Sequence, residues 1–402
     1  MSDDTQLPMA GVRVLDAATF LAAPFCASIL AEFGADVIKI EHPVHDDPMR
    51  KMGTVSDNGD TLMWVSETRN KRAMTLNLSN PKGAALFKEM VQNVDVVVEN
   101  FRPGTMERWG LGYKDLAAIN PRIVMVRITA YGQDGPYKDR PGFARIAHGF
   151  GGLTYLAGEA GQRPVIPGST SLGDYISGLY STIGVMMALR EAERSGKGQV
   201  VDMALYESVF RLLDEVVPAY ARFGMVRERM GPDTAILVPH SHYECADGHW
   251  IALACSSDKM FARLAHVMGR DDLAASDAYA SMPQSIEGRD KINAIVATWI
   301  RQHRRADLMK ICAEAEVPCG PINSVADIFQ DPHFAARKNL VRVQTDDAGE
   351  VTVPGVFPRL SRTPGHITHL GRRKSQDTSE ILKELLNKSE ADIAALKESG
   401  AI

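Results

Sequence analysis

The chain has 402 residues, of which 45% are hydrophobic and 24% are charged, and its formal net charge is -5. This composition is typical of a globular protein, and the length exceeds the size at which one hydrophobic core usually stops growing, so we expect two domains. A negative net charge without a basic segment argues against binding to nucleic acid or to an anionic membrane surface. An anionic ligand would therefore have to meet a local group of Lys and Arg.

The amino-terminal segment MSDDTQLPMAGVRVLD begins with acidic residues and lacks the basic start and the apolar core of a signal peptide. No apolar run in the sequence reaches the length of a membrane-spanning helix. The five cysteines contain no C-x-x-C pair, so we expect reduced, mostly buried thiols and no metal site. These features predict a cytoplasmic protein with no nucleic-acid or membrane partner.

Strand and helix patterns alternate over the first third of the chain. Buried strands are expected at residues 12–17, 36–42, 74–78, 94–101 and 123–132, and a helix is expected at 23–33. This alternation predicts an α/β fold in which helices cover a parallel sheet. The first strand-to-helix turn carries no G-x-G-x-x-G, which argues against an enzyme that binds a nicotinamide or flavin dinucleotide.

The pattern changes after residue 217. A polar segment containing Gly and Pro leads into a strand at 250–256 and then into helical patterns that continue to about residue 315. Beyond it, a hairpin is expected at 340–355. We therefore expect a Rossmann-like large domain made of residues 1–205 and 319–402, and a smaller α+β domain made of residues 206–318.

A long helix is expected at about residues 175–193, immediately after Asp174. The residues of its apolar face are Ile176, Leu179, Tyr180, Ile183, Met186 and Met187. Asp is a preferred N-cap residue, so one interpretation of Asp174 is a helix cap. The other interpretation is a nucleophilic carboxylate.

Four basic residues are expected where strands end, namely Lys71, Arg72, Arg102 and Arg108. Ligands of open α/β sheets bind outside the carboxyl ends of the strands, so these cations could converge on phosphate groups. The alternative is a solvated surface, where most Lys and Arg side chains lie. Their spacing leaves both interpretations open.

Six segments, taken together and in this order, resemble the class III CoA-transferase family, which includes formyl-CoA transferase and carnitine CoA-transferase. They are residues 11–43, 70–78, 96–116, 131–143, 173–208 and 316–334, which span nearly the whole chain. The resemblance implies a Rossmann-like large domain, a smaller domain, and two chains interlocked as a homodimer. It implies no metal and no bound organic cofactor, because coenzyme A is the substrate carrier.

In this family the Asp of a Gly-Asp pair before a long helix is the nucleophile, and it corresponds to Asp174. The resemblance implies that this carboxylate attacks an acyl-CoA thioester and forms a mixed anhydride. The released CoA thiolate then converts the anhydride into an aspartyl-CoA thioester, which the acceptor acid opens. The amides at the start of the helix are candidate donors to the oxyanion of each step.

The CoA-binding positions carried over from the family are His42, Leu76, Asn77, Leu78, Asn100, Phe101, Arg102 and Arg108, and we add Lys71 and Arg72 for their position. Formyl-CoA transferase has a Gln where this chain has Leu21, and its Gly-rich gating loop is absent here. The resemblance therefore implies an acyl site that differs from that of formyl-CoA transferase.

Residues 141–185 and 207–231 look most like the branch that handles C4 and C5 dicarboxylic acids, such as succinate, mesaconate, malate, citramalate or itaconate. The second carboxylate of such a substrate needs a cationic partner when it is buried. Arg145 and His240 are the candidates for this partner. The alternatives are a surface ion pair for Arg145 and a water-facing loop position for His240.

Two other functions stay open. The α-methylacyl-CoA racemases share the fold and the Asp, but they pair it with a His where this chain has Phe143. A racemase needs a second acid or base, which Phe cannot supply, and the nearby His148 is a single histidine of the kind that is usually structural. The third possibility is a non-catalytic acyl-CoA-binding protein, which would be indifferent to Asp174→Asn.

Overall fold

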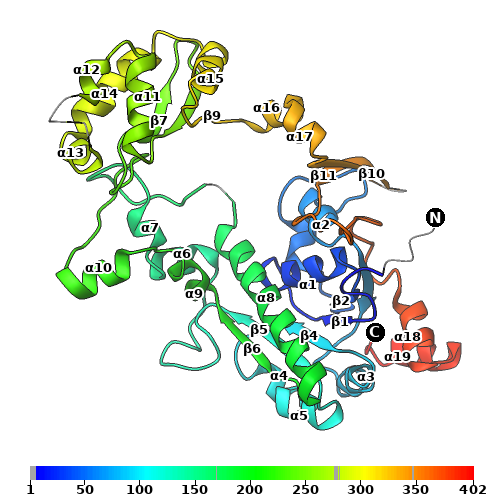
Figure 1. Cartoon of the computed structure of the whole chain (residues 1–402). Helices are drawn as coiled ribbons and strands as arrows, with labels where there is room; N and C mark the ends of the chain where they lie inside the picture. Colours follow the sequence, from blue (N-terminus) through cyan, green and yellow to red (C-terminus); the bar gives the residue numbers. More distant parts are fainter. Residues whose placement is uncertain (1–5, 169, 276–278, 280, 346–347) are drawn as a thin grey trace. The chain divides into compact units, whose positions relative to one another are not determined.

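The computed structural model describes residues 6–168, 170–275, 279, 281–345 and 348–402. The chain forms two compact units (Figure 1). The first contains the residues up to Leu153 together with 167–222 and 335–402, and the second contains 154–166 and 223–334. The first unit extends past residue 205 because helix α9 (Leu205–Phe210) packs on helix α8 (Leu172–Ser195).

A parallel six-stranded sheet forms the centre of the first unit. Its strands lie in the order β3 (Lys71–Thr75), β2 (Asp36–Glu41), β1 (Arg13–Asp16), β4 (Val96–Glu99), β5 (Val124–Thr129) and β6 (Val200–Ala204). This order reverses between β1 and β4, where sheets of this kind bind ligands at the carboxyl ends of the strands. The strands expected at 12–17, 36–42, 94–101 and 123–132 are confirmed, and β6 is a strand that the sequence pattern does not predict.

Helices cover both faces of this sheet (Figure 1). One face carries α3 (Pro81–Val91), α5 (Tyr113–Ile119), α18 (Thr378–Leu386) and α19 (Glu390–Glu398), and the other carries α1 (Ala22–Glu32), α6 (Ala144–Phe150), α8 and α9. Neighbouring residues of one strand, such as Val14 and Leu15, enter opposite clusters and are fully buried. Burial on both faces explains why the central strands β4 and β5 are nearly continuous apolar runs.

The remaining elements of the first unit are short. They are η1 (Pro48–Lys51), α2 (Leu62–Glu67), α4 (Thr105–Arg108) and the strands β10 (Leu340–Thr345) and β11 (Gly349–Pro354). The last two strands pair in an antiparallel manner, as expected for the hairpin, whose turn residues 346 and 347 lie outside the described residues. Helices α7 (Leu153–Leu156), α10 (Val216–Phe223) and α17 (Pro332–Ala336) lie where the chain passes from one unit to the other.

The second unit is built on an antiparallel sheet of three strands, β7 (His240–Glu244), β8 (Trp250–Ala254) and β9 (Cys319–Pro321). Its helices are α11 (Asp258–Val267), α12 (Asp271–Ala274), α13 (Met282–Glu287), α14 (Arg289–Ile300), α15 (Arg305–Glu314) and α16 (Val325–Gln330). The expected strand at 250–256 is β8. All five cysteines of the chain are free thiols, and four of them are buried.

The long helix α8 buries small residues instead of the expected apolar face. Its buried positions are Gly173, Ser177, Gly178, Ser181, Val185, Ala188 and Ala192. A Cβ on Gly178 would lie 2.8 Å from the carbonyl oxygen of Ala22 in α1, so this close approach of the two helices requires glycine. Ile183 and Met187 of the expected face are 51% and 68% exposed. The apolar face that the sequence indicates is therefore largely exposed on the single chain, and the small residues pack inward instead.

The expected position of Lys71 and Arg72 after a strand is also wrong. Strand β3 begins at Lys71 and ends at Thr75, so both cations lie at its amino end. Lys71 Nζ lies 2.7 Å from the carboxylate of Asp16, and both side chains are at most 1% exposed. Arg72 forms ion pairs of 2.7 Å with Asp36 and with a carboxylate of α18. Both cations therefore already have partners within the protein, and neither lines the cavity at the carboxyl ends of the strands that is described below.

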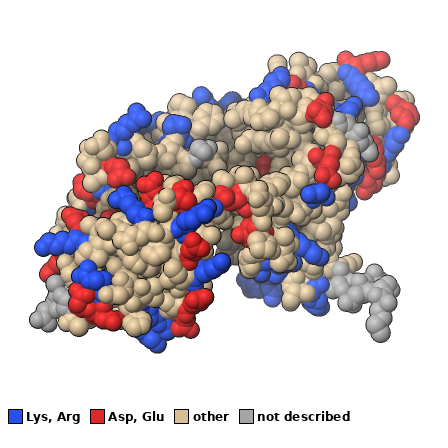
Figure 2. Space-filling model, turned by 90° about the horizontal axis from the view of Figure 1, so that it is seen from above, with Lys and Arg blue, Asp and Glu red and all other residues tan. Residues whose placement is uncertain are grey.

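Figure 2 shows one face of the molecule, on which cationic and anionic side chains are intermixed over the described residues. Among those residues, the helices contain no apolar stretch that is long enough to span a lipid bilayer. Within the same ranges, no three His, Cys, Asp or Glu side chains are grouped so that they could hold a metal ion.

Replacing Lys71 by Met is expected to lower the free energy of unfolding by about 3–5 kcal/mol, because the buried carboxylate of Asp16 loses its closest cation. The matched control Arg72→Met removes two partly exposed ion pairs and should cost only about 1–2 kcal/mol. Urea unfolding of the two variants measures the difference. Equal stabilities would contradict the structural role of Lys71.

Candidate active site

Asp174 lies in the first turn of α8, as the third residue of the helix. The N-cap residue is Ser171, whose carbonyl oxygen accepts the amide N–H of Asp174 at 3.0 Å. The interpretation of Asp174 as the cap is therefore wrong. In the part of the chain that the structure describes, no hydrogen-bond donor reaches the carboxylate of Asp174, so its oxygens are available to a ligand.

Burial raises the pKa of the Asp174 carboxyl group to about 6. The carboxylate is consequently the main form at neutral pH, although it is partly withdrawn from water. A carboxylate with fewer water molecules around it is a better nucleophile than a fully hydrated one. Strongly perturbed pKa values of this kind are typical of functional sites.

The residues on either side of Asp174 are held by two other helices. The amide N–H of Gly173 donates to Nε2 of His148 in α6 at 2.8 Å. The ring of Tyr175 packs edge-on against Phe25 of α1, with ring centroids 4.8 Å apart. The backbone that carries the carboxylate is thus fixed from both sides.

The turn between β1 and α1 is held by Asn100, which directly follows β4. Its side-chain oxygen accepts the amide N–H of Thr19 at 2.9 Å, and its side-chain N–H donates to the carbonyl oxygen of Thr19 at 2.7 Å. Asn100, a predicted CoA-binding residue, therefore uses its amide group to shape the backbone of this turn.

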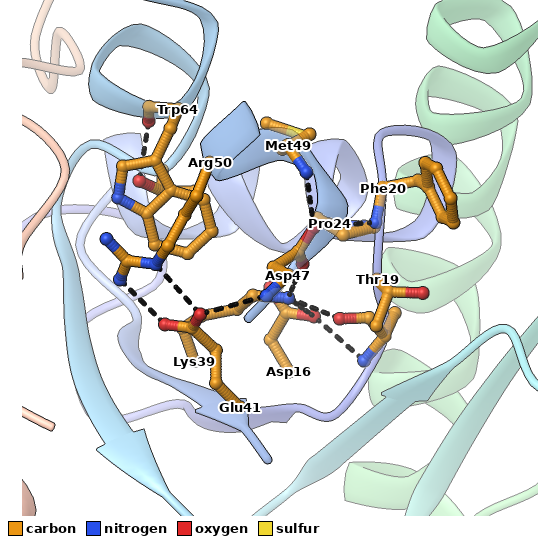
Figure 3. Close-up of polar contacts among 12 residues, drawn as sticks. Asp16, Thr19, Phe20, Pro24, Lys39, Glu41, Asp47, Met49, Arg50 and Trp64 are labelled. Carbon is orange, nitrogen blue, oxygen red and sulfur yellow. Dashed lines mark hydrogen bonds and ion pairs between the residues drawn. The ribbon is translucent and has the colours of Figure 1, made fainter. Parts of the chain in front are cut away.

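Buried charges hold the same turn from its other side, as Figure 3 shows. Lys39 of β2 donates to the carbonyl oxygen of Ala18, and Oδ1 of Asp47 accepts the amide N–H of Phe20 at 3.2 Å. Lys39 and Asp47 themselves form an ion pair of 2.9 Å. Phe20 is kept at a φ of 60°, a conformation that is rare for a bulky residue and that occurs mainly where the surroundings enforce it.

A cavity of about 180 Å³ opens at the carboxyl ends of β1, β2, β3 and β4. Its lining includes five predicted CoA-binding residues, His42, Leu76, Asn77, Leu78 and Phe101, and also Trp109 and His45, which are not among the predicted residues. The rings of Phe101 and Trp109 lie 5.1 Å apart. Two aromatic rings and two leucines provide the apolar walls that a planar base requires.

The polar rim of this cavity contains a neutral histidine. Nδ1 of His42 accepts the amide N–H groups of Val44 and His45 at 3.0 and 3.2 Å. Burial, followed by the charges of His45 and Lys374, lowers the pKa of His42. Its free Nε2–H is therefore a hydrogen-bond donor and not a cation at neutral pH.

Arg102 follows Phe101 in the loop after β4, and Arg108 is the last residue of α4; both side chains are exposed. Arg108 donates to the hydroxyl group of Thr105 at 2.8 Å. Neither guanidinium group forms an ion pair with the residues that the structure describes. Both are thus available to phosphate groups beside the cavity.

The three predicted acyl-side residues have different surroundings. Leu21 is 5% exposed and packs in a cluster with Trp64 and Met49, so it does not line the cavity at the carboxyl ends of the strands. Arg145 is exposed on α6 and forms no ion pair with any described residue. His240 begins β7 of the second unit, and its Nδ1 is buried without a hydrogen-bond partner among the described residues.

Comparisons with known proteins identify the family of the chain. A family model described as CoA-transferase family III matches residues 9–371. The chain is 51% identical to the succinyl-CoA–L-malate CoA-transferase beta subunit of Chloroflexus aurantiacus over 99% of both chains, and 40% identical to the succinyl-CoA–D-citramalate CoA-transferase of that organism over 97% of both. A crystal structure of a CAIB/BAIF family protein from Brucella suis matches with a TM-score of 0.83 and 31% identity, over 95% of this chain and 100% of that chain. The chain therefore belongs to CoA-transferase family III.

Proposed function

We propose that this protein transfers CoA from an acyl-CoA thioester to a carboxylic acid through covalent intermediates on Asp174. The observation that carries the proposal is the Asp174 carboxylate itself. It lies in the first turn of α8, burial raises its pKa, and no hydrogen-bond donor among the described residues occupies it. Membership in CoA-transferase family III supports the same reaction.

The reaction divides one exchange into steps that conserve the thioester energy. A carboxylate oxygen of Asp174 attacks the thioester carbonyl carbon, the C–S bond breaks, and CoA leaves as a thiolate beside a mixed anhydride. The thiolate attacks the aspartyl carbonyl carbon, which releases the first acid and forms an aspartyl-CoA thioester. The second acid attacks that thioester, and the thiolate then attacks the new acyl carbonyl to give the product and free Asp174.

The nucleotide part of CoA is assigned to the 180 Å³ cavity, with its phosphates toward the exposed Arg102 and Arg108. The acids are C4 or C5 dicarboxylates, with succinyl-CoA as the donor and a malate-like or citramalate-like acid as the acceptor. The names of the two Chloroflexus relatives support this choice. Arg145, which has no ion-pair partner among the described residues, is the candidate cation for the second carboxylate.

A second copy of the chain is the proposed partner. Leu179, Ile183 and Met187 of α8 are 49%, 51% and 68% exposed, and an apolar stripe of this size is usually covered by another chain. The interlocked homodimer implied by the resemblance would cover it. Because the Chloroflexus malate transferase is named as a beta subunit, a different family member is the alternative partner, and mass spectrometry of the intact assembly distinguishes the two.

The racemase alternative lacks a second acid or base. Phe143, at the position of the racemase His, is the N-cap residue of α6, and its ring packs against Phe20 with centroids 5.5 Å apart. Nε2 of His148 already accepts the amide N–H of Gly173. Neither side chain is free to exchange a proton with an α-carbon.

Incubation with succinyl-CoA and hydroxylamine is expected to convert Asp174 to a hydroxamate, because hydroxylamine attacks an activated aspartyl carbonyl. Peptide mass spectrometry detects the change. Asp174→Asn should show no hydroxamate while it still binds CoA. Absence of the hydroxamate from the wild-type protein with several acyl-CoA donors would leave acyl-CoA binding without transfer as the function.

The pH dependence of activity and that of stability should run in opposite directions. The rate kcat/KM should rise with pH through about 6, because only ionised Asp174 attacks. Since the folded-state pKa lies above the unfolded one, the folded state binds more protons between about pH 4 and 6, and stability falls as the pH rises through this range. The free energy of unfolding of Asp174→Asn, measured relative to that of wild type, should therefore increase by on the order of 3 kcal/mol from pH 4 to pH 7. Urea unfolding at both pH values and a pH–rate profile test the two trends, and a flat difference would contradict the raised pKa.

Arg145→Gln is expected to raise KM for a dicarboxylate acceptor roughly 10- to 100-fold, because one charge-assisted hydrogen-bond partner is lost. KM for a monocarboxylate acceptor of similar length should change little. Arg140→Gln, which removes another exposed arginine that stacks on Tyr137, is the control. Equal changes of KM for both acceptors would show that Arg145 does not pair with the second carboxylate.

A further inference from the structure

His148 is a buried histidine that the reaction steps above do not use. It lies on α6 and is 1% exposed. Its Nε2 accepts the amide N–H of Gly173 at 2.8 Å, and its Nδ1 has no partner among the described residues. An acceptor at Nε2 requires the neutral imidazole with its proton on Nδ1. Burial, and next the charge of Arg145, lower the pKa of His148, in agreement with a neutral ring.

The bond from His148 replaces a missing helix cap. The first amide N–H groups of a helix have no acceptor within the helix, and a side chain at the N-cap position usually supplies one. In α8 the N-cap residue Ser171 forms no such side-chain bond. His148 supplies the acceptor from another helix, at Gly173, which is the residue before Asp174.

Gly173, the residue before Asp174, is hydrogen-bonded through both its N–H group and its carbonyl oxygen. The N–H of Gly173 is bound by His148, and its carbonyl oxygen accepts the hydroxyl group of Ser177 at 2.7 Å. Ser177 is in turn 2.8 Å from the hydroxyl group of Ser208 in α9. A Cβ on Gly173 would lie 2.8 Å from Nε2 of His148, so the imidazole and the helix backbone fit without spare room.

We propose that His148 is a positioning residue whose Nε2 caps the first turn of α8 and so orients the carboxylate of Asp174 for attack on the thioester. This inference rests on the proposed function of Asp174. The imidazole acts through the backbone and does not touch the substrate. An imidazolium ring would direct an N–H group at the N–H of Gly173, so only the neutral form can act in this way.

Two amide side chains test the position of the acceptor. The side-chain oxygen of Gln is separated from Cβ by as many bonds as Nε2 of His, whereas the oxygen of Asn corresponds to Nδ1. His148→Gln therefore retains an acceptor for the N–H of Gly173, and His148→Asn does not. His148→Leu fills the space without an acceptor and controls for polarity.

The expected order of kcat separates positioning from a general structural role. His148→Gln should stay within about threefold of wild type, whereas His148→Asn and His148→Leu should each lose about 10- to 100-fold in kcat. KM for the acyl-CoA should change less than about threefold in all of them, because the nucleotide cavity is lined by other elements. Wild-type kcat in the Asn and Leu variants, or an equal loss in the Gln variant, would overturn the inference.

A second measurement does not depend on turnover. Nitrogen NMR of the full-length protein with labelled histidine should show, among the imidazoles that carry their proton on Nδ1, one whose signals are lost in His148→Gln. His303 and His369, whose Nδ1 atoms lie 2.9 and 2.8 Å from carbonyl oxygens, should keep their signals in that variant. A proton on Nε2 would overturn the inference even in an active enzyme. If the wild-type protein forms no hydroxamate at Asp174, the proposed function fails, and the tautomer of His148 still decides whether it caps α8.

Discussion

Four buried charges constrain the carboxyl edge of the sheet, and the site depends on them. Lys71 lies 2.7 Å from Asp16, and Lys39 lies 2.9 Å from Asp47 and 4.0 Å from Asp16, with every side chain at most 1% exposed. Buried charges are tolerated only when they are paired with good geometry. The four groups therefore hold β1, β2, β3 and the loop of Asp47 in one arrangement, which in turn fixes the β1–α1 turn and the cavity beside it.

The contact between α1 and α8 links this arrangement to the helix that carries Asp174. Gly178 lets the helix backbones approach closely, and Phe25 of α1 packs against Tyr175. The small residues that face inward leave the large apolar side chains of α8 outside, where Ile183 and Met187 are exposed. One helix thus combines a tight inner face, which positions Asp174, with an outer face suited to another chain.

Most buried carboxylates of the first unit are paired with a cation. Glu41 accepts from Arg50, and Glu99 accepts from Arg127 at 2.6 Å. Asp174 differs because no described donor reaches its oxygens and because its pKa is raised by burial alone. A buried carboxylate without a charged partner is unusual, and such exceptions are typical of functional sites.

The sequence by itself determined four of the five expected strands, because runs of Val and Ile are typical of strands that are buried on both faces. The resemblance pointed to Asp174 and to five of the residues that line the cavity. The sequence placed Lys71 outside a strand, because two adjacent cations are typical of a loop. Only the structure shows that the carboxylate of Asp16 lies 2.7 Å from Lys71 and pairs with it. The sequence indicated the apolar face of α8, but not that small residues pack inward and leave that face exposed. The cap from His148 to Gly173 joins residues 25 positions apart. Only the tertiary structure decided these features, because each depends on which distant side chain becomes the neighbour.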